Sequence, residues 1–390
     1  MRTTIEQLKP AIFSLYEHFH QHPEISWQEV QTTSFLADFL KSYNCRLKTF
    51  EDMTGVVAEL GSESPDAFTV GLRADMDALW QEVDGLFCAN HSCGHDAHMT
   101  MALGVLMVLH EQNLPLPGKL KMIFQPAEES GTGALSLVQK QVVDDVDYLY
   151  GVHLRPIQEV AFGRAASAIL HGAAATLSAH IKGDDSHGAR PHLGTNAIEV
   201  AASIVGELKG IHLDPLVPYS VKMTQLSSGG KSTNIIPGSA RFHLDIRAQT
   251  NAIMDALLIK TEHVLQQVAK LYAVELDYEI TERVYAAEVH EEARLIMAQA
   301  ITDALGSEQL EPPILTPGAE DFHYYTKERP HLKATMLGLG CDLAPGLHHP
   351  HMHFRKEALL DGIEILTRAV LLTFDRHAQN QALIQPLEER

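Results

Sequence analysis

The sequence predicts an α/β protein with a mostly parallel mixed sheet flanked by helices, into which a smaller ferredoxin-like domain is inserted. Strand-like and helix-like segments alternate in the first part of the chain, which is typical of a parallel sheet. The middle of the chain instead has the order β-α-β-β-α-β. A length of 390 residues also exceeds one ordinary hydrophobic core. We therefore expect a discontinuous larger domain (1–170 and 285–390) and an inserted domain (171–284).

The larger domain begins with helical spacing of apolar residues from Ile5 to about Leu40, interrupted by a turn at His22-Pro23. The segments that follow are, in chain order, a strand (Phe68–Ala74), a helix (Gly94–His110) and two further strands (Lys119–Phe124 and Tyr148–Tyr150). Each strand is followed by a polar loop. Ligand sites of parallel sheets lie at the carboxyl ends of the strands, so these loops are the expected position of a functional site.

The inserted domain is predicted from alternation in its strands and apolar stripes on its helices. Its strands are Thr176–Lys182, Ser220–Leu226, Ala240–Ala248 and Val274–Ile280, and its helices are Asn196–Ile211 and Ala252–Tyr272. Helical spacing resumes at Ala287–Ala304, where the chain is expected to return to the larger domain.

Composition limits the class of protein. Hydrophobic residues make up 45% and charged residues 21%, which is typical of a globular protein. The formal net charge of −20 disfavours nucleic acid and acidic membrane surfaces as partners. The four cysteines have no disulfide-framework spacing, which favours a reducing compartment. With no apolar signal core and no run of 18 apolar residues, we expect a cytoplasmic protein.

Side chains of the types that bind metal ions recur at the predicted strand ends and loops. Thiolate, imidazole and carboxylate are the ligands of zinc-class ions. These groups occur in five clusters: Asp75-Met76-Asp77, Cys93-Gly94-His95, Glu128-Glu129, His153, and His348-His349-Pro350-His351. The combination predicts a metal-dependent hydrolase, with one carboxylate of the Glu128-Glu129 pair left over as general base.

Each cluster also has a simpler interpretation. Glu128-Glu129 is, in isolation, a solvated pair in a Gly-bounded loop, and Cys93 is a buried thiol beside a capping histidine. The late histidine run cannot supply more than one or two ligands. Asp75 and Asp77 could contact a metal ion or the ligand histidines, or could simply cap the next segment, and Asp96 is a candidate for orienting the ligands. In the inserted domain, the loop around His187, and also Asn234 and Arg247, have no distinctive signal by themselves.

Seven segments together carry a more specific signal, and they follow one another over nearly the whole chain: Arg73–Leu79, Ser92–His98, Gln125–Glu129, Gly151–His153, Asn234–Pro237, Gly318–Phe322 and Leu347–Pro350. They resemble the metallopeptidase family of aminoacylases, carboxypeptidase G, hippurate hydrolases and plant auxin-amino-acid conjugate hydrolases, and most closely its AmhX-like amidohydrolase branch. One departure is Trp80, where most relatives have proline; another is Ala319 in place of the commoner serine. Both leave substrate specificity open.

The resemblance implies a zinc-peptidase-like catalytic domain with two divalent metal ions per subunit and a lid domain that also forms a homodimer. Zinc is favoured, and manganese, cobalt or nickel would also fit. By position, the implied metal ligands are Cys93, His95, Glu129, His153 and His348, and the implied general base is Glu128. The lid would supply His187 to the oxyanion of the partner subunit's site, while Asn234 and Arg247 would hold the substrate carboxylate.

The predicted function is hydrolysis of the amide bond of N-acyl amino acids or similar small conjugates by metal-activated water. A dipeptidase or carboxypeptidase with the same site is the alternative enzyme. A nucleophilic Cys93 with His95 as base represents another mechanism. However, the two residues are only two positions apart at the start of a helix, which makes a hydrogen bond between their side chains difficult. A binding protein without activity is the non-enzymatic alternative; such relatives usually lose the base or a ligand, and here all are present.

Overall fold

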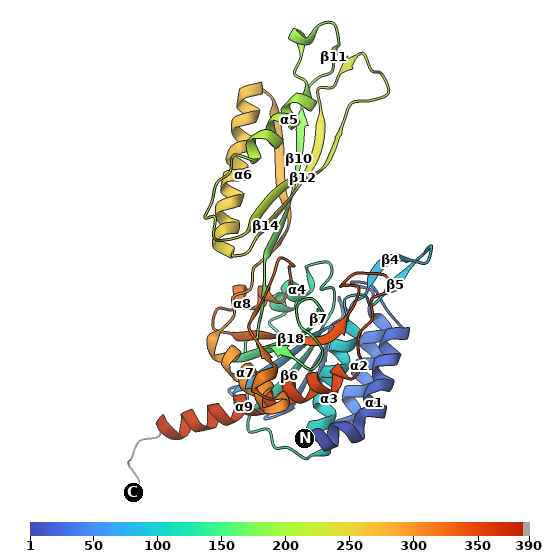
Figure 1. Cartoon of the computed structure of the whole chain (residues 1–390), viewed down its shortest axis with the longest axis vertical. Coiled ribbons are helices and arrows are strands. Elements are labelled where there is room, and N and C mark those ends of the chain that lie inside the picture. Colours follow the sequence, from blue (N-terminus) through green and yellow to red (C-terminus); the bar gives the residue numbers. More distant parts are fainter. Residues whose placement is uncertain (385–390) are drawn as a thin grey trace. The chain divides into compact units, whose positions relative to one another are not determined.

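The computed structural model describes residues 1–384 and divides into two compact units (Figure 1). The larger unit consists of Met1–Leu170, Glu288–Leu315 and the chain from Asp321 onward, and the smaller unit consists of His171–Ala287 with Thr316–Glu320. Residues 385–390, at the end of the predicted catalytic domain, lie outside the described residues.

The larger unit is built on a mixed sheet, as predicted, and this sheet has eight strands. Its order is β1 (Arg46–Thr49), β2 (Val56–Gly61), β6 (Lys119–Gln125), β3 (Thr69–Asp75), β7 (Tyr148–Pro156), β18 (Lys333–Leu343), β8 (Ala165–Ala166) and β16 (Leu310–Glu311). The central pairs β6–β3, β3–β7 and β7–β18 are parallel, while β1–β2, β2–β6 and β18–β8 are antiparallel. The parallel centre brings the carboxyl ends of β6, β3 and β7 to one edge, where parallel sheets place their sites.

Helices surround this sheet and make the core. They are α1 (Arg2–Gln21), α2 (Val30–Ser42), α3 (His95–Glu111), α4 (Gly133–Gln139), α7 (Glu291–Leu305), α8 (His323–Glu328) and α9 (Ala358–Ile384). α3 is buried from His95 to Leu109 because it contacts α1, α9 and strands β3 and β7. This all-round burial explains why its sequence is apolar on every face. Minor elements are the 3₁₀ turn Ser307–Gln309 and the strand pair β9 (Ile169–His171) and β17 (Ile314–Thr316).

Two details differ from the sequence prediction. His153 was expected just beyond the end of a strand, but it lies inside β7, paired with Gly338, because β7 continues alongside β18 as far as Pro156. The hairpin of β4 (Leu79–Val83) and β5 (Leu86–Asn90) was not predicted. Its two-residue turn, Asp84-Gly85, has positive φ at both residues, which is the sequence signal that identifies such a hairpin.

The smaller unit contains a four-stranded antiparallel sheet in the order β12 (Tyr219–Ser228), β14 (Ala240–Ala248), β10 (Ala173–Lys182) and β15 (Glu275–Val284). With α5 (Ala197–Leu208) and α6 (Asn251–Tyr272), the elements follow the order β-α-β-β-α-β. Alternate residues of β10 and β14 are buried, so the sheet has one face in the core and one polar face. A small pair, β11 (Ser186–His187) and β13 (Ile235–Ile236), and a 3₁₀ turn (Pro191–Leu193) complete this unit.

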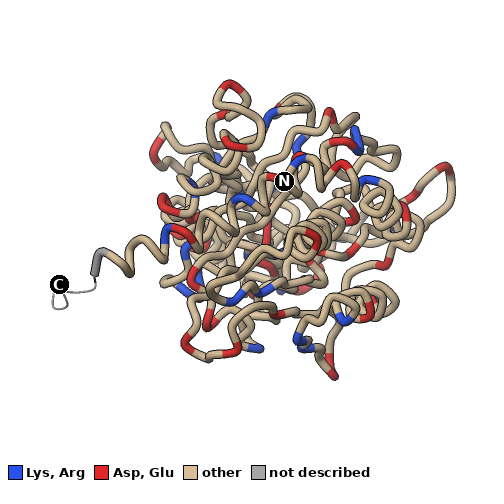
Figure 2. The backbone as a smooth tube through the Cα atoms, turned by 90° about the horizontal axis from the view of Figure 1, so that it is seen from below, with Lys and Arg blue, Asp and Glu red and all other residues tan. Residues whose placement is uncertain are grey.

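Acidic positions outnumber basic ones and are spread along the chain rather than gathered in one element (Figure 2). Among residues 1–384, no helix has both the length and the apolar character needed to cross a bilayer.

Candidate metal centre

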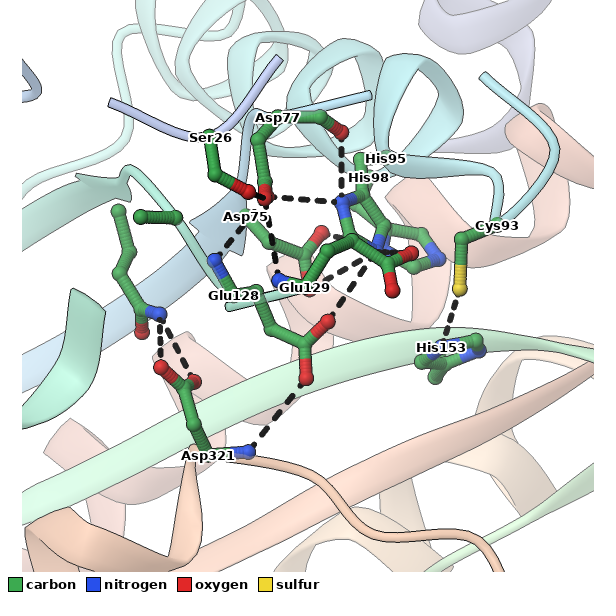
Figure 3. Close-up of polar contacts among 12 residues, drawn as sticks. Ser26, Asp75, Asp77, Cys93, His95, His98, Glu128, Glu129, His153 and Asp321 are labelled. Atoms are coloured by element: carbon green, nitrogen blue, oxygen red, sulfur yellow. Dashed lines mark hydrogen bonds and ion pairs between the residues drawn. The ribbon is translucent and has the colours of Figure 1, made fainter. Parts of the chain in front are cut away.

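The structure gathers the predicted metal-ligand candidates of the larger unit at the carboxyl edge of the sheet. Figure 3 shows Cys93, His95, Glu129 and His153 together with Glu128. The ligand atoms of Cys93, His95 and His153 all lie within 4.8 Å of one another, and so do those of Cys93, Glu129 and His348. A third group with the same spacing joins His95 to Glu128 and Glu129. Because these groups share members, they describe one continuous centre.

Two atoms of this centre are buried and have no hydrogen-bond partner among the described residues. They are Nε2 of His95 and Oε1 of Glu129, and they lie 3.9 Å apart. A buried polar atom without a partner costs about 1–3 kcal/mol. A divalent cation bound by both atoms would remove that cost. The spacing is close to the separation expected of two ligands of one ion at 2.0–2.3 Å, so these residues fit a metal.

Cys93 and His95 are presented by the turn that starts α3. Gly94 between them has φ 90° and precedes the first turn of the helix, and a Cβ at this position would lie 3.0 Å from a methyl group of Leu154. Sγ of Cys93 lies 3.6 Å from Nε2 of His153 on β7. The left-handed glycine therefore permits the thiol and the imidazole to enter the same centre from adjacent positions.

Asp77 orients three members of the centre. Its two carboxylate oxygens accept the backbone N–H groups of Glu128 (3.1 Å) and Glu129 (3.0 Å). Nδ1 of His95 lies 2.9 Å from the Asp77 carbonyl, which leaves Nε2 directed toward the centre. Ser26, before α2, donates to the same carboxylate over 2.6 Å. The predicted supporting role of Asp77 is thus matched by specific contacts.

Asp75 is fully buried at the end of β3 and is held by two partners. Nη1 of Arg73 lies 2.5 Å from one oxygen, and Nδ1 of His98 lies 2.6 Å from the other. The backbone N–H of Leu154 donates to Nε2 of His98, so this imidazole must carry its proton on Nδ1 and donate to Asp75. Although burial opposes ionisation, His95, His98 and Arg73 lower the pKa of Asp75. His98 is therefore a support residue with no ring nitrogen left for a metal.

Asp96 lies on the side of α3 that faces α1. Its carboxylate contacts Nδ1 of His20 over 2.7 Å and accepts the backbone N–H of Ala97. Burial opposes its ionisation, but the hydrogen bond to His20 lowers the pKa of Asp96. This residue fixes the start of α3 to α1 and supports Cys93 and His95 only through the helix.

The electrostatic environment of the centre is negative. Burial alone would lower the pKa of His95, yet the carboxylates of Asp75 and Asp77 raise it to about 10. Burial, and then the nearby carboxylates of Glu129 and Glu128, raise the pKa of the Cys93 thiol. A site in which acids surround an imidazole and a thiol is suited to bind cations, whose charge would reverse both effects.

Two supporting residues were not found by sequence analysis. Glu29 is completely buried and accepts the backbone N–H of Ala127 (2.8 Å) and the hydroxyl of Thr54 (2.6 Å). Ala127, directly before Glu128, has a left-handed φ of 55°. Since a glutamate near the start of a helix is common, nothing in the sequence distinguishes Glu29.

Asp321 is the second missed residue, although it lies in the matched segment Gly318–Phe322. Its carboxylate accepts from Gln125, from Nη2 of Arg73 and from the N–H of Ala134. Its own backbone N–H lies 3.4 Å from Oε1 of Glu128 (Figure 3). Asp321 therefore ties the loop of the predicted general base to the end of β6.

The remaining predicted residues belong to the smaller unit. His187 and the residue after Asn234 are neighbours in the β11–β13 pair, and the carbonyl of Asn234 accepts the N–H of Gly188. Arg247 is at the opposite end of β14 from β13, roughly 20 Å away at 3.3 Å per residue, where its guanidinium contacts Asp245. Within one copy, the structure brings His187 and Asn234 together but does not bring Arg247 to them.

Comparison with known proteins identifies the family. Residues 71–372 match the model of peptidase family M20/M25/M40. The chain belongs to this family. It is also 32% identical to a probable hydrolase of Synechocystis sp. over 95% of this chain and 97% of the relative. This M20-family member is therefore a hydrolase of amide bonds, and the predicted resemblance is confirmed.

Two further relatives of this M20-family protein come from Bacillus subtilis. The N-acetyl-L-cysteine deacetylase is 26% identical over 97% of this chain and 91% of its own length. The crystal structure of YXEP, a dinuclear metal-binding peptidase of the M20 family, superimposes with a TM-score of 0.81 at 23% identity, covering 95% of this chain and 99% of that chain. This structural similarity establishes the common α/β fold.

Proposed function

We propose that the protein is a metal-dependent amidohydrolase that cleaves the amide bond of N-acyl amino acids or similar small conjugates. The observation that carries the proposal is a pair of buried atoms that make no hydrogen bond among the described residues, His95 Nε2 and Glu129 Oε1, within an acidic centre. The deacetylase activity named for one Bacillus subtilis relative supports the acyl-amino-acid substrate class.

The proposed ligands of two divalent ions are Cys93, His95, Glu129, His153 and His348. His348 is the one half-exposed member, with its Nε2 3.4 Å from Oε1 of Glu129. When bound, such ions polarise the amide carbonyl and lower the pKa of a water molecule. Thiolate and imidazole ligation favours zinc, and manganese, cobalt or nickel would also fit.

Glu128 is the proposed general base. Its Oε2 lies 3.7 Å from Nε2 of His95, so it borders the centre, and the Asp77 contact fixes its backbone. Its carboxylate takes a proton from the attacking water while the water oxygen bonds to the amide carbon. The same proton then passes to the leaving nitrogen as the C–N bond breaks, which gives a carboxylic acid and an amine.

The smaller unit is proposed to act as a lid and to form a homodimer. His187 would donate to the developing oxyanion, and Asn234 and Arg247 would bind the substrate carboxylate. Because β14 separates Arg247 from Asn234 within one copy, both groups reach one small substrate only if two copies contribute. This separation supports the dimer as part of the proposal.

The decisive experiment is an activity screen of the metal-free protein and of protein reconstituted with zinc, manganese, cobalt or nickel. The substrates are N-acetyl and N-benzoyl amino acids and matched free dipeptides. Hydrolysis of the acyl compounds only after metal addition is the expected result. Preference for free dipeptides would favour the dipeptidase or carboxypeptidase alternative, and full activity in chelator would favour a nucleophilic Cys93. Absence of hydrolysis with every metal would reject the proposal.

A further inference from the structure

His348 differs from the other proposed metal ligands in its surroundings. Its side chain is 54% exposed, whereas Cys93, His95 and His153 are buried. It also has a left-handed φ of 62°, which is uncommon for a residue other than glycine. An exposed ligand in a strained backbone conformation requires contacts outside the centre to hold it in place.

The β4–β5 hairpin supplies these contacts. The side-chain amide of Gln81 donates to the backbone carbonyl of His348 over 3.1 Å, and Asn90 donates to the carbonyl of Pro350 over 2.9 Å. The N–H of His348 itself donates to the carbonyl of Ser92, the residue before Cys93. The backbone of His348 is thus held on both sides by residues next to the buried half of the centre.

The orientation of the Gln81 amide is determined by its other partners. Its Oε1 accepts from the Ser92 hydroxyl at 2.5 Å and from the Asn90 amide at 3.1 Å. Since both of these partners donate, the oxygen must face them and the NH₂ group must face the His348 carbonyl. Gln81 therefore connects the Cys93 turn to the His348 loop through a fixed amide.

We propose that Gln81 is a positioning residue that holds the His348 loop against the Cys93 turn and thereby sets the affinity of the metal position formed by Cys93, Glu129 and His348. The neighbouring group of candidate ligands, Cys93 with His95 and His153, is buried and shares the thiol but not His348, so it depends less on this hairpin. The inference rests on the proposed metal centre and assigns a role to the segment where Trp80 departs from the family pattern.

The hairpin provides its own control. Cross-strand pairing places Trp80, Glu82 and Phe87 on one face and Gln81, Cys88 and Asn90 on the other. Glu82 is exposed and adjacent to Gln81 in sequence, but its side chain is on the face opposite the His348 contact. Glu82→Ala therefore tests the effect of altering the hairpin without removing the amide.

The first measurement is hydrogen exchange of the backbone around residues 344–353 in the metal-free protein. Gln81→Glu keeps the acceptors for Ser92 and Asn90 but replaces the donor to His348 with a carboxylate oxygen. Gln81→Glu and Gln81→Ala should both speed exchange in this segment, while Glu82→Ala should match the unchanged protein. Equal exchange in all four proteins would overturn the positioning role whether or not the protein proves to be an amidohydrolase.

The second measurement is a cobalt(II) titration followed by visible absorption and by calorimetry. We expect Gln81→Glu to weaken one of two binding events by about 10- to 100-fold, as loss of a supporting contact to a ligand usually does, and to weaken the other event less. Equal weakening of both events, or of neither, would contradict the inference. If the protein binds no cobalt, the proposed metal centre is rejected. The exchange measurement still decides in that case whether Gln81 holds the His348 loop.

Discussion

The backbone N–H of Glu129 donates to the Asp77 carboxylate over 3.0 Å, which fixes a proposed metal ligand to a residue 52 positions earlier in the chain. The neighbouring oxygen of Asp77 does the same for Glu128. One buried carboxylate therefore sets the relative positions of a proposed ligand and the proposed base, and the side chains of both residues can remain directed at the centre.

Asp77→Asn should weaken metal binding by about 10- to 100-fold while the fold is retained. The replacement amide has one acceptor oxygen in place of two, so only one of the two backbone donors keeps its partner. The measurement is metal titration of the purified variant, with circular dichroism to confirm folding. Asp66→Asn, an exposed carboxylate in a loop, is the matched control. Unchanged affinity in Asp77→Asn would show that the Glu128-Glu129 loop positions itself without this contact.

Glu128→Gln should reduce kcat by about 10²- to 10⁴-fold, because an amide cannot accept the proton of the attacking water. Metal stoichiometry should be unchanged, since Glu128 is not assigned as a ligand. The measurement pairs turnover on an N-acetyl amino acid with metal analysis of the same sample. Near-normal turnover would remove Glu128 from its assigned role and leave the metal centre standing.

Removal of metal should destabilise the folded protein. Binding of a cation to the buried atoms of His95 and Glu129 that make no hydrogen bond would stabilise the folded state. A ligand present at 1,000 times its Kd contributes about 4 kcal/mol to folding. Thermal unfolding with and without a chelator should therefore differ by several degrees, and zinc should restore the higher Tm. His95→Ala should lose this metal-dependent increase. An identical Tm in all conditions would speak against tight binding.

Sequence analysis predicted the α/β class and the loops that form the centre because both depend on local patterns. Strands β3 and β6 and the helix α3 are largely apolar and buried along their length, and their limits were predicted to within one residue. The prediction that His153 lies beyond the end of a strand was wrong, because the end of β7 is set by its pairing with β18, a strand that lies much later in the chain. Pairing between strands that are distant in the chain cannot be predicted from the local sequence.

The supporting contacts were less predictable for the same reason. Glu29 and Gln81 act through backbone groups of Ala127 and His348, which are distant in sequence and carry no side-chain signal. By contrast, Asp75 and Asp77 were recognised as supports because they belong to a motif at a strand end. Residues that act on a ligand through its backbone are therefore found from three-dimensional contacts and not from residue type.

Glu29→Ala should lower both stability and turnover. The change removes the acceptor of the Ala127 N–H and the Thr54 hydroxyl, and unsatisfied buried donors cost about 1–3 kcal/mol each. Ala127 would then relax from its left-handed φ and shift Glu128, so kcat should fall more than KM rises. Glu29→Gln retains an acceptor oxygen and should recover most of the activity. Denaturant unfolding and steady-state kinetics measure both effects, with exposed Glu51→Gln as control. Failure of glutamine to do better than alanine would contradict a positioning role.

Asp145 should stabilise the protein through two buried lysines of β6, away from the metal centre. Lys119 and Lys121 are almost fully buried, and both ammonium groups contact the Asp145 carboxylate. Removing one partner of a buried ion pair leaves an uncompensated charge. Because the Asp145 side chain is about one-third exposed and Glu59 also contacts Lys121, we expect Asp145→Asn to cost about 1–2 kcal/mol.

The pH dependence of this effect has a defined sign. Burial opposes ionisation, yet Lys121 and Lys119 lower the pKa of Asp145 below its ordinary value of 3.8. A carboxyl group with a lower pKa in the folded state stabilises the protein above the unfolded value, and this contribution is lost as pH falls through the folded value. The difference in unfolding free energy between the original protein and Asp145→Asn should therefore have its largest value near neutral pH and decrease below pH 3.8. Urea unfolding from pH 7 to pH 3 measures it, with Asp66→Asn as control; a difference that grew on acidification would rule out the ion pair as its cause.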